Sequence, residues 1–170
     1  MTGNADDVII RPLNAEDSIQ ELTDLLHRSY KVLADMGFRY VATYQDVATT
    51  SKRLGRGPAY VACADSVLVG TITLKRPELT RGSSWYDRAD VASFGQFAVS
   101  PDYQRCGVGS RLLQTVEATA RSWGAAELAL DTAEGAVHLQ RFYQKRGYRF
   151  IEYVDWDVTN YRSVLLSKTL

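Results

Sequence analysis

Apolar and polar residues follow two periods along this chain, one typical of strands and the other typical of helices. Between 30 and 56 the pattern weakens and indicates broken helices around an aromatic turn. Helical spacing predicts helices at 19–26, 112–123 and 136–146. Short apolar runs predict strands at 8–12, 59–63, 68–74, 94–99, 128–130, 150–156 and 161–166.

The order of these elements indicates a sheet built partly as an antiparallel meander. A turn around Asp65 and Ser66 joins the runs 59–63 and 68–74, and the run 94–99 follows them. The connection from 76 to 93 is long, and such a segment in a compact domain is usually a binding loop or disordered. It carries the adjacent aromatics Trp85 and Tyr86, which we expect to contact a ligand.

Length and charge narrow the classes of protein to consider. The 170 residues are enough for a substantial core, so we expect one domain over 1–170. Lysine and arginine number 20, as do aspartate and glutamate, so no net field attracts nucleic acid or an anionic membrane. No apolar run approaches the ~20 residues that span a bilayer, and residues 1–7 lack the features of a signal peptide. We expect a cytoplasmic protein with neither kind of partner.

Cysteine and histidine give no sign of a metal site. Cys63 and Cys106 lie far apart without paired spacing, and His27 and His138 form no ligand pattern. We therefore expect two free thiols and no bound metal.

The segment richest in chemistry lies between the strand at 94–99 and the helix at 112–123. Residues 104–109, Gln-Arg-Cys-Gly-Val-Gly, lead into that helix. Glycine removes side chains where a ligand approaches the backbone, and the first turn of a helix offers amide N–H groups without internal partners. A phosphate or diphosphate fits such a corner. The lysine of a nucleotide-triphosphate loop is missing after Gly107, and Leu112 replaces the third small residue of a dinucleotide fingerprint.

This segment resembles the acyl-CoA-binding segment of the GNAT superfamily of N-acyltransferases. In that family a strand ending in valine, here Val99, is followed by a Gln/Arg-x-x-Gly-x-Gly/Ala loop that opens a helix. Residues 142–148, Phe-Tyr-Gln-Lys-Arg-Gly-Tyr, are similar to a second family motif, at the matching distance and in the matching order. The resemblance implies an α/β (α+β) fold, with a mixed, mainly antiparallel sheet of about six to seven strands and helices on both faces.

The resemblance also implies acetyl-CoA as the acyl donor. Tyr143 is expected near the thioester sulfur, where its hydroxyl can hydrogen-bond or protonate the departing thiolate. The strand at 94–99 is expected to splay from the strand at 128–131, with Gly95 marking a bulge. The residues assigned to the cofactor are Phe97, Ala98, Val99, Gln104, Arg105, Cys106, Gly107, Val108, Gly109, Ser110 and Tyr143.

Two departures from the family pattern concern a cofactor contact and the base. Ala136 stands where many members carry asparagine, and the strand before the glycine loop offers Ser93 and Gln96 where some carry glutamate. An amine of pKa ~10.4 must lose its proton before it attacks, which costs about 4 kcal/mol near neutral pH. The candidate proton acceptors, among which the sequence does not choose, are Asp90, Asp131, Glu134, His138 and a water chain held by Gln96.

These observations predict an N-acetyltransferase that moves an acetyl group from acetyl-CoA directly to a primary amine of a small molecule or peptide. We expect Trp85, Tyr86 and Gln96, with the region 30–44, to contact the acceptor. Two alternatives stay open: a non-catalytic acyl-CoA sensor or interaction module of the same fold, and a transferase using another acyl donor or a hydroxyl acceptor. A homodimer is compatible with each of these.

Overall fold

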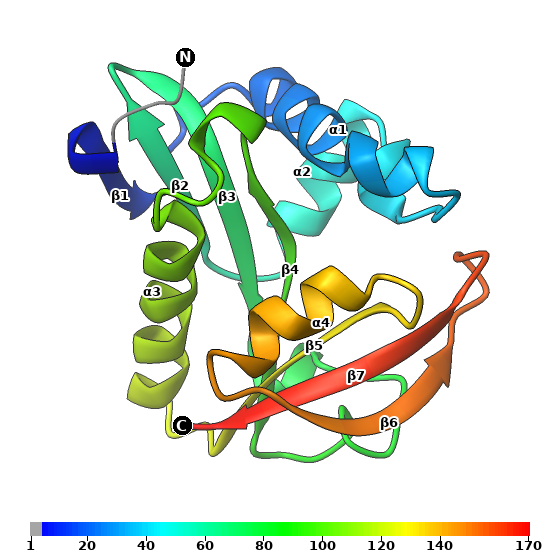
Figure 1. Cartoon of the computed structure of the whole chain (residues 1–170). Coiled ribbons are helices and arrows are strands. Elements are labelled where there is room, and N and C mark those ends of the chain that lie inside the picture. Colours follow the sequence, from blue (N-terminus) through cyan, green and yellow to red (C-terminus); the bar gives the residue numbers. More distant parts are fainter. Residues whose placement is uncertain (1–4) are drawn as a thin grey trace.

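Residues 5–170, described by a computed structural model, form one seven-stranded sheet with helices on both faces (Figure 1). The strand order is β1-β2-β3-β4-β5-β7-β6, and each neighbouring pair is antiparallel except β4 with β5. The predicted fold class is therefore confirmed. Residues 1–4, part of the stretch expected to lack a signal peptide, lie outside the described residues. The strands are β1 Val8–Pro12, β2 Ala59–Ala64, β3 Val67–Lys75, β4 Val91–Val99, β5 Glu127–Ala133, β6 Arg149–Asp155 and β7 Arg162–Thr169, and the helices are α1 Ile19–Asp35, α2 Val47–Leu54, α3 Val108–Ser122 and α4 Val137–Gln144.

Local sequence explains several of these boundaries. Ser18 caps α1 because its hydroxyl accepts a hydrogen bond from the Glu21 amide at 3.2 Å. At the β2–β3 turn, Asp65 and Ser66 have φ angles of 47° and 69°. Positive φ at both central residues matches the right-handed twist of the flanking strands, so the predicted hairpin is confirmed.

Among the elements that extend beyond their predicted limits, α1 and β4 matter most for the pocket. α1 continues to Asp35, so Tyr30 and Leu33 belong to it and not to a separate broken helix. The burial of Leu33 continues the apolar face of α1, which tertiary packing stabilises. β4 begins at Val91, three residues before the predicted start at 94, because Val91 and the two residues after it pair with β5.

The helices divide between the two faces of the sheet. Figure 1 shows α3 and α1 on opposite sides of β2 and β3. Neighbouring residues of β2 point to opposite faces, as the period of a strand requires. Ala62 packs in the cluster that includes Leu112 and Val116 of α3, whereas Val61 packs against Leu22 and its neighbours on α1.

The parallel strands β4 and β5 pair over only three residues of each strand. Val91, Ala92 and Ser93 pair with residues 127–129, and the strands then diverge. This is the splay that we expected from the family resemblance. The C-terminal two thirds of β4 therefore has a β5-facing edge without a strand partner, which leaves backbone groups there available to other molecules.

The bulge in β4 lies beside the residue expected to mark it. Thr73 pairs with Gly95 and Thr71 with Ala98, so β4 carries one extra residue between them. Gln96 has a φ of 47°, whereas Gly95 has no positive φ, so the expectation for Gly95 is corrected to the next residue. Hydrogen bonds hold the Gln96 side chain in a buried position, and they stabilise this unusual conformation for a residue with a Cβ.

Candidate active site

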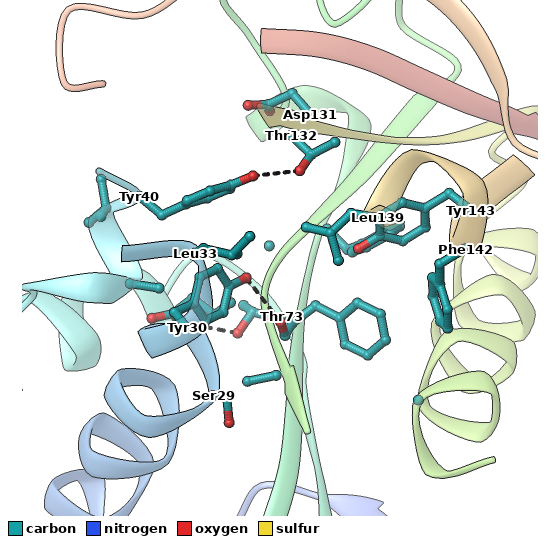
Figure 2. Close-up of a pocket in the computed structure, with 18 of the residues that line it drawn as sticks. Ser29, Tyr30, Leu33, Tyr40, Thr73, Asp131, Thr132, Leu139, Phe142 and Tyr143 are labelled. Carbon is teal, nitrogen blue, oxygen red and sulfur yellow. Dashed lines mark hydrogen bonds between the residues drawn. The ribbon is translucent and has the colours of Figure 1, made fainter. Parts of the chain in front are cut away.

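A pocket of about 1360 Å³ occupies the space where β4 and β5 diverge. Figure 2 shows Tyr30 and Tyr40 reaching into it from one side, and Leu139, Phe142 and Tyr143 of α4 from the other. The splay creates this space because the hydrogen-bonded ladder ends at Ser93 and α1 and α4 cover the gap. Two regions that are far apart in sequence thus form the walls of one cavity.

The N-terminus of α3 lies at one end of the pocket, at the corner where the sequence predicts a phosphate or diphosphate, which we call the coenzyme corner. Gly107 is the N-cap residue with a φ of 85°, and no side chain caps the first amides of the helix. A Cβ at Gly107 would have no heavy atom within 4 Å, so the backbone is open on this side. Both features leave amide N–H groups and the positive end of the helix dipole free for a phosphate.

Arg105 and Arg146 lie at this corner, and Arg141 and Lys145 are further basic residues in the lining of the same pocket. Arg146 is fixed, because its Nε and Nη2 donate to Ser110 Oγ at 3.1 and 2.7 Å and its guanidinium lies 3.6 Å from the Phe142 ring centroid. Sequence reasoning named only Arg105 as a cation here. The others could have been found from their spacing, since Arg141 and Lys145 are four residues apart and share one helix face.

Tyr143 lies in an aromatic cluster at the middle of the pocket. It is only 7% exposed, and its ring centroid lies 6.1 Å from that of Phe94 and 5.2 Å from that of Phe142. Burial, with smaller contributions from Tyr30 and Tyr40, raises the pKa of its hydroxyl well above the ordinary value. Tyr143 is therefore a neutral phenol that can donate a hydrogen bond, and full loss of its proton is harder than for a free phenol.

Two further tyrosines bind backbone and side-chain groups beside the splay. Tyr30 donates to the carbonyl of Phe97 at 2.9 Å. The Tyr40 hydroxyl accepts from the amide of Ala133 at 2.9 Å and lies 2.8 Å from Thr132 Oγ1. Sequence reasoning placed the region 30–44 on the acceptor side without separating these residues, because the contacts arise only from the tertiary fold.

Most of the predicted cofactor residues line the pocket, and two do not. Val108 is buried in the core and Cys106 is outside the lining, so their predicted part would fall to backbone amides. Gln104 uses its Nε2 to bond the Val99 carbonyl at 3.0 Å, which fixes the end of β4. The predicted residues that line the pocket are Phe97, Ala98, Val99, Gln104, Arg105, Gly107, Gly109, Ser110 and Tyr143.

Of the three single residues predicted to contact the acceptor, two line the pocket and one does not. Gln96 and Tyr86 line the pocket. Trp85 is not among the lining residues, because its amide bonds to Glu152 of β6 and its ring lies 4.1 Å below the Arg88 guanidinium. The sequence could not distinguish these adjacent aromatics, since the direction of each side chain in an irregular loop depends on distant partners.

The candidate proton acceptors differ in whether they line the pocket. Asp90 pairs with Arg88, and Glu134 pairs with Arg162, both away from the pocket. Asp131 lines the pocket and accepts hydrogen bonds from Tyr86 Oη at 2.8 Å and Trp156 Nε1 at 2.9 Å. His138 lies in the pocket wall and is exposed, whereas both functional atoms of Gln96 already have protein partners. Asp131 and His138 are thus the acceptors that the geometry favours.

Residues 5–170 contain neither a metal-binding cluster nor a helix able to span a membrane. No cluster of three or more histidine, cysteine or acidic residues is placed there to hold a metal ion. Within the same range, each helix is too short or too polar to cross a bilayer.

Comparison with known proteins bears on the identity of the chain. The model of the acetyltransferase (GNAT) family matches residues 19–148. S-(2-succino)cysteine N-acetyltransferase from Bacillus subtilis (strain 168) is 28% identical over 138 residues, covering 80% of this chain and 81% of that protein. S-alkylcysteine N-acetyltransferase from the same organism is 27% identical over 172 residues, covering 96% and 90%.

A solved structure gives the same answer for the fold. A GNAT family acetyltransferase from Elizabethkingia anophelis with acetyl-CoA bound matches 97% of this chain and 99% of its own, with 20% sequence identity and a TM-score of 0.68. The family model spans well over half of the chain and includes both the glycine loop and Tyr143. The chain therefore belongs to the GNAT acetyltransferase family.

Proposed function

We propose that this protein transfers the acetyl group of acetyl-CoA directly to the primary amine of a small amino acid, with S-substituted cysteines as the first candidates. The observation that carries the proposal is one continuous pocket. It runs from the uncapped N-terminus of α3, past the Tyr143 hydroxyl, to the carboxylate of Asp131. The two curated relatives, named for the N-acetylation of cysteine derivatives, support this choice of acceptor.

The corner at α3 fits the diphosphate of coenzyme A. The open backbone at Gly107 and the free amides of α3 would bind its oxygens, with Arg105 and Arg146 supplying positive charge. The edge of β4 at Phe97 to Val99 has no strand partner, and its backbone would bond the amides of the pantetheine arm beside the contacts from Tyr30 and Gln104. When bound, acetyl-CoA supplies an acetyl group already activated as a thioester.

The chain's own residues then have separate tasks. Asp131 attracts the substrate ammonium, and Asp131 or His138 accepts its proton, directly or through water. The amine nitrogen bonds to the acetyl carbon as the carbon–sulfur bond breaks. Tyr143 donates a hydrogen bond to the departing thiolate sulfur, which stabilises negative charge that develops only as that bond breaks.

Release of CoA thiol, followed with a thiol-reactive dye, tests the proposal. We expect turnover with acetyl-CoA and S-methylcysteine, and none with N-acetyl-S-methylcysteine, whose amine is blocked. Asp131→Asn should raise KM for the acceptor and leave acetyl-CoA affinity unchanged. Binding of acetyl-CoA without turnover of any amine would favour the sensor, and equal turnover of the blocked compound would indicate an acceptor group other than the amine.

A further inference from the structure

The pocket lining away from α3 includes basic side chains of α2, β3 and the loops that follow them. Among residues 5–170, none of them forms an ion pair, although six such pairs occur elsewhere. The one carboxylate among the described residues of the lining is Asp131, and it is already bonded to Tyr86 and Trp156. The basic residues are Lys52, Arg53, Arg56, Lys75 and Arg81, which we call the cationic cluster.

Arg53 is held in a fixed position within this cluster. Its Nη1 donates to the side-chain oxygen of Gln45, which is 2% exposed. Gln45 in turn donates to Gln96 at the β4 bulge, at 2.8 Å, and to Thr50 at 2.7 Å. The Arg53 Nη2 lies 3.8 Å from the position that a Cβ would take at Gly95, against the backbone of β4. The remaining guanidinium donors are thus presented to the cavity on a preorganised support.

Lys75 approaches the same space from β3. It is half-buried, has no ion pair among the described residues, and interacts electrostatically with Asp131, Arg53 and Arg56. Burial lowers the pKa of both Lys75 and Arg53, because their charged forms are poorly solvated there. Asp131 interacts with both cations from beyond ion-pair distance, and an anionic ligand that enters the pocket offsets the remaining cost of burying their charge.

Charge balance indicates how many anionic groups the acceptor carries. The ammonium of an amino acid matches Asp131, and its α-carboxylate matches one cation of the cluster. Several cations then still lack a partner. An acceptor with one or two additional carboxylates matches the pocket better than an acceptor with an alkyl side chain, since complementary charge raises both affinity and selectivity.

We propose that Arg53 and Lys75, with Arg56 at the rim, form a carboxylate-binding subsite that selects acceptors bearing a carboxylate on the side chain. The inference rests on the proposed function, because it names the substrate class of that same site. It places the specificity of the enzyme in Arg53 of α2 and Lys75 of β3, away from the residues proposed to bind the acyl donor.

The test compares three acceptors that differ in carboxylate number: S-methylcysteine, S-carboxymethylcysteine and S-(2-succino)cysteine. We expect kcat/KM to rise in that order for the wild type. Arg53→Gln and Lys75→Gln should each lower kcat/KM for S-(2-succino)cysteine by roughly 10- to 100-fold, the effect of losing one charged hydrogen bond, and change that for S-methylcysteine by less than about threefold. Lys75→Arg, which keeps the charge, should retain the preference. Arg121→Gln, at an exposed position of α3 outside the pocket, is the matched control.

Calorimetric binding of S-(2-succino)cysteine without acetyl-CoA separates the subsite from the reaction. Weaker binding to Arg53→Gln and Lys75→Gln than to the wild type and to Arg121→Gln supports the subsite even if no acceptor is turned over. Turnover of all three acceptors with equal kcat/KM, unaffected by the two variants, overturns the subsite and leaves the proposed function standing. Absence of both turnover and binding overturns both. Equal acetyl-CoA affinity in all variants verifies that they are folded.

Discussion

Replacing Tyr143 with phenylalanine removes one oxygen atom from the pocket. The ring contacts survive, since phenylalanine packs equally well against Phe142 and Tyr148, whose centroids lie 5.2 and 5.8 Å away. The hydroxyl has no hydrogen-bond partner among residues 5–170, so its removal leaves no other donor or acceptor without a partner. We therefore expect Tyr143→Phe to fold with an unchanged melting temperature.

Turnover should respond very differently from stability. A hydrogen bond to a charged group contributes about 1.5–3 kcal/mol, and each ~1.4 kcal/mol of lost transition-state stabilisation lowers a rate tenfold. The predicted loss in kcat is therefore about 10- to 150-fold. Because Tyr143 would bond the thiolate as it departs and not the bound thioester, the affinity for acetyl-CoA should stay within about twofold. Stopped-flow or steady-state release of CoA thiol, with calorimetry for binding, measures both quantities.

Tyr148 supplies the matched control. It is also a buried tyrosine, but its hydroxyl donates to Glu117 Oε1 at 3.0 Å. Tyr148→Phe should cost about 1.5–3 kcal/mol of folding free energy, or roughly 3–10 °C in Tm, and leave kcat unchanged. The reasoning is refuted if Tyr143→Phe turns over at the wild-type rate, or if the two variants lose stability and turnover in parallel.

Three further predictions concern the coenzyme corner, the subsite and the sheet. Gly109→Val should fold, since a Cβ there meets nothing closer than 3.5 Å. Its methyl groups fill space beside Phe97, so calorimetry should show acetyl-CoA binding weakened at least about tenfold. Unchanged affinity would contradict the proposal that the coenzyme binds at this corner. Burial lowers the pKa of Lys75, so its positive charge is lost at a lower pH than that of an ordinary lysine, whose pKa is ~10.4. The preference for S-(2-succino)cysteine over S-methylcysteine should therefore fall as pH rises from 7 toward 10, and a flat ratio would exclude Lys75. Burial alone would raise the pKa of Glu127, but hydrogen bonds from Arg149, Ser167 and Thr169 outweigh it and lower the pKa. Ionised Glu127 therefore stabilises the folded state at pH values above its unfolded pKa of ~4.3, and this stabilisation is lost as the pH falls through its folded pKa. Glu127→Gln should lower Tm at pH 7, and the difference from the wild type should become small near pH 3 in calorimetric scans.

The coenzyme corner and the order of the elements are properties of local sequence. The amides at 107–110 are directed by the backbone of their own loop and helix start, so Gly107 and Gly109 suffice to indicate an anion site. The same holds for the hairpin at Asp65, where turn residues fix the register of the strands that they join. Strand and helix periods record which face is buried, and the seven-stranded sheet follows from them once the family resemblance supplies the pairing order.

The acceptor end of the pocket was decided by the tertiary structure alone. Trp85 and Tyr86 are neighbours in sequence, yet Glu152 bonds the Trp85 backbone and Asp131 bonds the Tyr86 hydroxyl, so only the second aromatic lines the pocket. The bulge lies at Gln96 and not at Gly95, because Gln45, from a distant loop, binds the Gln96 side chain.

The cationic cluster shows the same limit of sequence reasoning. Arg53 and Lys75 belong to different elements, and each alone resembles an ordinary surface cation. Only the fold brings α2 and β3 to one wall of the pocket, where neither cation forms an ion pair with a residue of the range 5–170. Local backbone conformation is set by neighbouring residues, so the sequence could indicate the corner proposed for the coenzyme. Convergence of side chains depends on long-range packing, so the cluster proposed to select the acceptor emerged only from the folded structure.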